Sequence, residues 1–197
     1  LEKIGAPVID RLRANLEYPL PSLDKVKPGE SKLNNYLKHF NNGKQCQWSL
    51  KLDGVSSMLT YKKGKLVNIN TRGDGTVGGD VSYLKDYIKF PHVSHEHDLL
   101  VVRGEFILSK EVWEKKYKGT FSNARASVYG KINSGFILSA LNDIELIADE
   151  IMVMNNDKLV PSSSQALKML TALGFHVVDA GVFPLQPTIF EIMELYK

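Results

Sequence analysis

Residues 47–71, QWSLKLDGVSSMLTYKKGKLVNINT, contain three short segments separated by two glycine-containing turns. The segments 47–53, 56–61 and 66–71 are rich in β-forming residues or alternate in polarity, and DG and KKGK separate them. Runs of this kind predict antiparallel strands, here with a hairpin at Gly64. We therefore expect a domain that is built on antiparallel sheets.

The rest of the chain adds more strands and places helices between them. Helical spacing of apolar residues and the positions of capping residues predict these helices. Strands interspersed with helices in this way indicate the α+β class. The further strands are expected at 99–108, 144–154 and 176–183, and the helices at 31–40, from Ser109 to about Tyr117, from Ser163 to Gly174, and from Thr188 onward.

The N-terminal region has a different composition. Residues 1–30 contain four of the eight prolines, and we read 1–18 as an irregular lead-in. The predicted domain then runs from 19 to 197, because no linker inside this range is long enough to divide it. The chain starts at Leu1 rather than Met, which indicates a piece of a longer protein.

Composition excludes several classes of protein. A net charge of +3 permits a polyanionic partner without requiring one. The single cysteine, Cys46, excludes a disulfide scaffold and fits a reducing, intracellular compartment. No apolar run approaches the roughly 18 residues that a membrane-spanning helix needs.

The segment KLDG (51–54) is the first candidate for chemistry. If it lies on a strand, Lys51 and Asp53 point to the same face. A neutral lysine amine is a good nucleophile toward phosphorus or carbonyl carbon, but the free amine has a pKa of about 10.4 and needs nearby cations to stay neutral. The alternative is a surface lysine that forms a salt bridge before a turn. A bare K-x-D-G segment favours this alternative.

The glycine-rich segment TRGDGTVGGD (71–80) formally satisfies G-x-G-x-x-G. A dinucleotide-binding fold also needs a helix directly after the glycines, and GGDVSYLKDY does not resemble one. No G-K-[ST] follows, and the lysine precedes the glycines rather than following them, which excludes a Walker loop and a protein kinase. What remains is a loop that carries the cation Arg72, or simply a glycine-rich connection.

Two further segments carry charged residues that could bind a ligand. In VVRGEF (101–106), Glu105 could bind a ribose hydroxyl or a divalent metal, or could form an internal ion pair with the neighbouring arginine. In FSNARASVYG (121–130), Arg125 lies among small residues and suits a phosphate, unless it is an ordinary loop arginine.

Taken together, these segments resemble the adenylation (nucleotidyltransferase) domain of NAD-dependent DNA ligases. KLDG is similar to the family's nucleophile motif, TRGDGTVGGDVS to its TRGDG-x-x-GED-V-T segment, VRGEF to its VRGE strand, and FSNARASVYG to its F-x-N-x-R-N-A-A-A-G loop. PLPSLDKV (19–26) and PSSSQALKMLTALGFHV (161–177) resemble the segments before and after these motifs. The resemblance runs from about residue 19 to the end, and it implies the DNA ligase and mRNA capping enzyme-like nucleotidyltransferase fold.

The resemblance also implies a reaction and a set of partners. Lys51, with Asp53 in its motif, would attack NAD to form lysyl-AMP, and the AMP would pass to the 5′-phosphate of nicked double-stranded DNA with the help of Mg²⁺. Glu105 would contact the ribose or the metal. The residues expected to contact or border the nucleotide are Ser22, Leu23, Leu50, Lys51, Arg72, Glu105 and Arg125.

Several positions depart from the family pattern. Ser49 replaces a glutamate that reads adenine, Gly79 replaces the glutamate of GED, and Asn133 replaces a second arginine, although Lys131 is near. These departures favour a divergent branch of viral type. The family's last motifs are not found, so we expect a partial adenylation domain whose remaining ligase domains belong to the full protein. Two alternatives stay open: a non-catalytic scaffold or DNA-binding module, and an ATP-using polynucleotide ligase.

Overall fold

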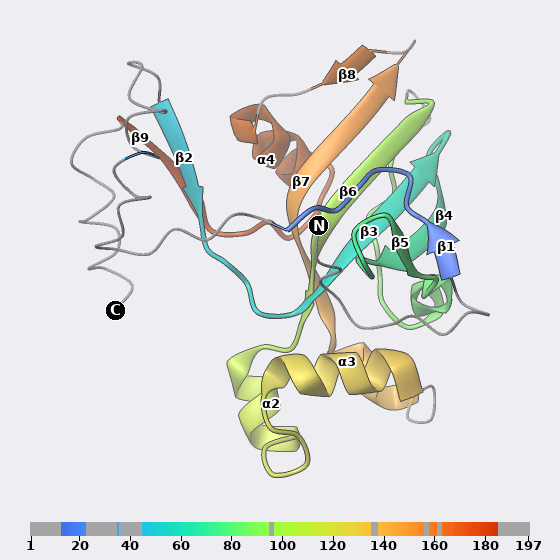
Figure 1. The fold of residues 1–197 in the computed structure, drawn as a ribbon, viewed down its shortest axis with the longest axis vertical. Helices are drawn as coiled ribbons and strands as arrows, with labels where there is room; N and C mark the ends of the chain where they lie inside the picture. The colour runs from blue at the N-terminus through green and yellow to red at the C-terminus, as the bar shows by residue number, and fades with distance from the viewer. Residues whose placement is uncertain are drawn as a thin grey trace. The chain divides into compact units, whose positions relative to one another are not determined.

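The computed structural model describes residues 13–22, 35, 45–94, 97–134, 138–155, 158–160 and 163–184. These residues form two compact units. The larger unit combines 13–21 with the described part of 51–178, and the smaller unit combines the described parts of 22–50 and 179–197. Within each unit, the elements can be followed in Figure 1.

The larger unit is built on a five-stranded antiparallel sheet with the strand order β4-β3-β6-β7-β8. Lys63, at φ 47°, and Gly64, at φ 75°, form the predicted hairpin between the first two strands. Two consecutive positive φ angles match the right-handed twist of the flanking strands. The strands are β3 (Val55–Lys62), β4 (Lys65–Thr71), β6 (Leu99–Ile107), β7 (Glu145–Asn155) and β8 (Lys158–Val160).

The two faces of this sheet differ in chemistry. Along β6, Leu100, Val102 and Phe106 are buried in the main core, while Arg103 and Glu105 alternate with them on the opposite face. The core face is covered partly by helix α4 (Ser163–Ala172), which contributes buried apolar side chains and runs beside β7 in Figure 1. This opposite, polar face carries Arg103 and Glu105, and a second apolar cluster of Leu20, Met58 and Val101 covers part of it.

Two of the helix signals that the sequence predicts, the cap at Ser109 and the stop at Gly174, are present. Ser109 caps α2 (Lys110–Lys116) by accepting a hydrogen bond from the Val112 N–H at 3.2 Å, and Gly174, at φ 86°, follows the end of α4. The remaining helical elements are η2 (Ser82–Asp86), α3 (Ala124–Ser134) and η3 (Leu138–Asp143).

Short two-stranded pairings complete the fold. The N-terminal stretch that we read as irregular contains a strand, β1 (Arg13–Asn15), which pairs with β5 (Val77–Gly79). The three residues of β1 have no clear strand pattern of their own. They form a strand because β5 offers them main-chain hydrogen-bonding groups. In the smaller unit, β2 (Gln45–Ser49) pairs with β9 (Ala180–Pro184).

Two predicted strands have different limits in the structure. The strand expected at 47–53 ends at Ser49, so Lys51 and Asp53 do not lie on a strand. The strand expected at 176–183 is divided: Val177 forms a bridge to Ala148 of β7, and regular pairing with β2 begins only at Ala180. The apolar run 176–183 therefore pairs first with the five-stranded sheet, through Val177, and then with β2, from Ala180 onward. The helix expected at 31–40, apart from Asn35, and the helix expected from Thr188 lie outside the described residues.

Candidate active site

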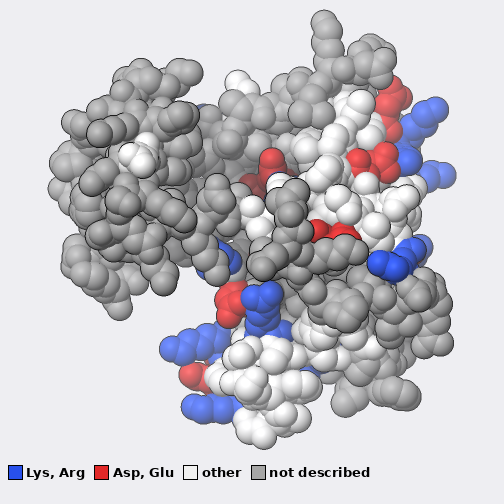
Figure 2. All heavy atoms as spheres, viewed as in Figure 1, with Lys and Arg blue, Asp and Glu red and all other residues white. Residues whose placement is uncertain are grey.

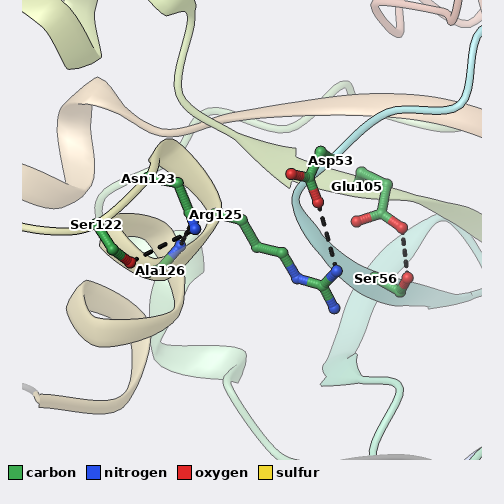
Figure 3. A network of polar contacts seen from close by, with 7 residues as sticks. All are labelled: Asp53, Ser56, Glu105, Ser122, Asn123, Arg125 and Ala126. Carbon is green, nitrogen blue, oxygen red and sulfur yellow. Dashed lines mark hydrogen bonds and ion pairs between the residues drawn. The ribbon is translucent and has the colours of Figure 1, made fainter.

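Glu105 lies on the polar face of the large sheet, directly opposite Ser56 in the pairing of β6 with β3. The Ser56 hydroxyl donates a hydrogen bond to Oε1 of Glu105 (Figure 3). Burial raises the pKa of Glu105, and this hydrogen bond opposes the rise. The Asp149 carboxylate raises the same pKa further, whereas the charges of Lys51 and Arg125 lower it. Two other predicted site residues, Lys51 and Arg125, thus lie near enough to Glu105 for their charges to act on it.

Lys51 and Asp53 lie in the short connection between β2 and β3, and both are exposed. The expectation that strand alternation places them on one face is wrong, because no strand runs through them. Asp53 Oδ1 instead lies 3.4 Å from a terminal guanidinium nitrogen of Arg125. This pair is 74% and 58% exposed at its two side chains, so it is an adaptable contact rather than a strong one.

Helix α3 carries Arg125 in its first turn, although the sequence predicted a loop there. Asn123 explains the difference: its side-chain Oδ1 accepts from the Ala126 N–H at 2.7 Å, and its main-chain oxygen accepts from the Ser127 N–H at 3.1 Å. Asparagine is among the best N-cap residues. In Figure 3, the Arg125 side chain extends from the start of this helix toward Asp53 and Ser56.

Removing this cap should have a measurable cost. Asn123→Ala is expected to lower the free energy of unfolding by about 1 kcal/mol, because an N–H of the first turn loses its acceptor. Chemical denaturation would measure the change. Ser122→Ala is the matched control, since the Ser122 hydroxyl only accepts a long, exposed contact of 3.5 Å from Asn123. Equal stabilities for the two variants would contradict the capping role.

The loop after β4 is held by its own hydrogen bonds. Asp74 Oδ1 accepts from the N–H groups of Thr76, at 3.0 Å, and Val77, at 2.8 Å, and from the Thr76 hydroxyl at 2.9 Å. Gly73 and Gly75 have φ angles of 55° and 98°, which other residues rarely adopt. Asp74 and the two glycines are therefore structural residues.

Arg72 begins this loop directly after the end of β4. Its main-chain N–H donates to the main-chain oxygen of Ser56 at 2.9 Å, which joins it to the strand position that faces Glu105. The main chain of the glycine-rich segment is therefore hydrogen-bonded to β3 at the residue that faces Glu105.

The structure places the other predicted residues as follows. Leu50 belongs to the smaller unit, and its N–H donates to the Asp179 oxygen at 2.9 Å. Ser22 belongs to the same unit, and Leu23 lies outside the described residues. Of the departures from the family pattern, Ser49 ends β2, Gly79 ends β5, and Asn133 donates from its side chain to the Tyr129 oxygen of its own helix at 2.8 Å.

On the face shown in Figure 2, basic and acidic side chains of the described residues lie side by side, so this face does not carry charge of a single sign. Across the described ranges, no group of three or more His, Cys, Asp or Glu side chains could hold a metal ion. A hollow lined by Phe90, Pro91, Phe175 and His176 contains none of the candidate residues. In the same part of the chain, no helix is long and apolar enough to cross a bilayer.

Sequence reasoning did not find Ser56 or Asn123. Ser56 lies in a run of ordinary strand residues, and only the register between β3 and β6 shows that it meets Glu105. For Asn123, a usable signal existed: asparagine before ARASVYGKINS, a segment with few helix breakers, is a possible start of a helix.

The fold defines a class. The described residues form an α+β domain of antiparallel sheets with interspersed helices, which is the predicted nucleotidyltransferase fold of the DNA ligase and mRNA capping enzyme type. The family described as the NAD-dependent DNA ligase adenylation domain matches residues 13–197. The chain belongs to this family. The match begins before residue 19 and includes β1.

Individual relatives agree with this assignment. A DNA ligase of Acanthamoeba polyphaga mimivirus is 34% identical over 186 residues, which are 92% of this chain and 28% of the viral protein. A putative DNA ligase of Invertebrate iridescent virus 6 is 38% identical over 154 residues, which are 75% of this chain and 23% of that protein. The chain thus spans about a quarter of the length of these relatives.

A solved structure of an RNA ligase from Naegleria gruberi, with AMP and manganese, also resembles the chain. The identity is 13% and the TM-score is 0.45, and the likeness covers 97% of this chain and 53% of the other.

Proposed function

We propose that this chain is the adenylation core of an NAD-dependent DNA ligase. Lys51 would form a lysyl-AMP intermediate from NAD, and the AMP would pass to the 5′-phosphate of nicked double-stranded DNA so that the nick can be sealed. The observation that carries the proposal is the family match over residues 13–197, and the charges of Lys51 and Arg125, which lower the pKa of Glu105, support it.

The first step asks little covalent chemistry of the protein. The Nζ lone pair of Lys51 forms a bond to the α-phosphorus, the bond from that phosphorus to the departing nicotinamide mononucleotide breaks, and the proton leaves Nζ. Only a neutral amine can do this. Arg125, whose guanidinium lies 3.4 Å from Asp53 in the same connection, can hold a phosphate oxygen. Phosphoryl transfer depends mainly on this kind of positioning and charge neutralisation.

The residues present fit a magnesium ion that is shared with substrate phosphates. Magnesium in proteins commonly uses one or two carboxylates together with phosphate oxygens and water. Glu105 offers one carboxylate on this face, and Ser56 occupies only its Oε1. Glu105 would hold the ion or the ribose, and a bound ion would neutralise the charge that develops on the phosphate.

The remaining assignments follow from the same proposal. Arg72 would lie by the nucleotide, and Ser22, Leu23 and Leu50 would border the AMP. Residues 19–197 would form a partial adenylation domain, and nick sealing would require the remaining domains of a ligase. Asp53 would complete the motif of Lys51, with Arg125 at 3.4 Å from its carboxylate.

The choice of nucleotide provides the direct test. The longest form of the protein is incubated with Mg²⁺ and either NAD labelled in its adenylate half or labelled ATP. We expect covalent label from NAD and none from ATP, with release by acid as expected of a phosphoramidate bond. Label from ATP alone would replace the proposal with an ATP-using polynucleotide ligase. Label from neither would replace it with a non-catalytic scaffold or DNA-binding module.

A further inference from the structure

Helix α3 contains a buried lysine, Lys131, which the proposed reaction does not use. The residue is 7% exposed. Its ammonium nitrogen lies 3.6 Å from the ring centre of Tyr117 and 4.7 Å from the ring centre of Phe121. Both distances are within the range of cation–π attraction. A charged group is thus held against two aromatic rings instead of extending into water.

The groups around Lys131 form a closed set of contacts. Asp143 accepts a hydrogen bond from the Tyr117 hydroxyl and forms an ion pair of 2.6 Å with Lys116. Burial lowers the pKa of Lys131, and the Asp143 charge opposes this effect. The carboxylate and the two rings therefore compensate the cost of burying the ammonium group. This set connects α2, the turn before α3, the end of η3 and α3 itself.

Phe121 connects this cluster to the start of α3. Its ring also lies against Gly130, where an added Cβ atom would be 2.8 Å from the ring. Phe121 is two residues before Asn123, the residue that caps the helix, and Arg125 follows in the first turn. Gly130 and Lys131, in the C-terminal half of α3, therefore contact Phe121, which lies just before the N-terminus of the same helix.

We propose that Lys131 is a positioning residue for Arg125. It attracts the ring of Phe121 and so fixes the entry of the chain into α3, which sets the place from which the guanidinium reaches Asp53. An apolar side chain could fill the same space, but it would not attract both rings toward one point. The role in adenylate transfer rests on the proposed function, whereas the effect on the start of the helix does not.

Amide hydrogen exchange tests the positioning directly. In Lys131→Met, which keeps the length of the side chain and removes its charge, we expect the Ala126 amide to exchange at least about fivefold faster. The Val112 amide, which is capped by Ser109 in α2, should not change. Lys131→Arg should restore protection, and Lys115→Met on the exposed surface of α2 is the matched control. Unchanged protection at Ala126, or equal loss at Val112, would overturn the proposal.

A double-mutant cycle tests the connection to the reaction. We expect Lys131→Met to slow lysyl-AMP formation about tenfold in the otherwise unchanged protein, and less than twofold in an Arg125→Ala background. Equal slowing in both backgrounds would show that Lys131 does not act through Arg125, and would overturn the proposal. If the unchanged protein forms no adenylate, the proposed function fails, and hydrogen exchange still decides the positioning role.

Discussion

Lys51→Arg is expected to abolish covalent labelling by NAD, with a decrease on the order of a thousandfold or more. The variant retains a positive charge at the connection between β2 and β3 but has no amine that can be neutral at working pH. Because Lys51 is exposed and outside any strand, the substitution should leave the free energy of unfolding within about 0.5 kcal/mol. Labelling with adenylate-labelled NAD, followed by gel separation, measures the first effect, and chemical denaturation measures the second.

A matched control separates this role from a general effect of charge. Lys65→Arg changes an exposed lysine at the start of β4 and should label normally. In a form of the protein that seals nicks, Lys51→Arg should still seal DNA that already carries AMP on its 5′-phosphate, because that step no longer needs the nucleophile. Covalent label retained in Lys51→Arg would assign the nucleophile to another residue.

Gly54→Ala is expected to lower the free energy of unfolding by about 3 kcal/mol. A Cβ atom at Gly54 would lie 2.3 Å from the main-chain oxygen of Phe106 and 2.8 Å from a methyl group of Ile107. The nearer atom belongs to the backbone of the central strand β6, so it cannot move away without shifting the strand that carries Glu105. Urea denaturation would measure the loss, and a fall in adenylation should accompany it.

Gly119→Ala is a useful comparison for this variant. Gly119 has a φ of 100°, and nothing lies within 4 Å of its added Cβ atom, so only the backbone conformation carries a cost. That cost should be about 1–2 kcal/mol. If Gly54→Ala destabilises the protein no more than Gly119→Ala does, the close contact with β6 is not what requires glycine in the K-x-D-G motif.

The elements of this fold could be predicted where the signals are local. The turn at Gly64, the cap at Ser109 and the stop at Gly174 each depend on one residue and its immediate neighbours. The end of β2 at Ser49 and the start of β9 at Ala180 could not be predicted. An apolar run shows that a strand forms, but it does not show which sheet the strand joins. The strand β1 is a stronger example, since its pairing depends on a partner more than 60 residues away.

The site shows the same division between local and distant information. Motif order identified Lys51, Arg72, Glu105 and Arg125 as one group, but it gave no contacts among them. The hydrogen bond between Ser56 and Glu105 depends on the register of two strands that are 49 residues apart in sequence. The ion pair of Asp53 with Arg125 requires α3 to begin where it does, and the sequence was read there as a loop.

The hydrogen bonds inside the glycine-rich loop affect how tightly a ligand can bind. A segment with the composition of TRGDGTVGG would, as a free chain, lose much conformational entropy on becoming ordered around a nucleotide. In this protein, the three contacts of Asp74 Oδ1 already restrict the loop before any ligand arrives. The loop has already lost this entropy during folding, so ordering the loop does not reduce the favourable free energy of ligand binding. If the chain binds NAD as proposed, Asp74 would therefore strengthen nucleotide binding without touching the nucleotide.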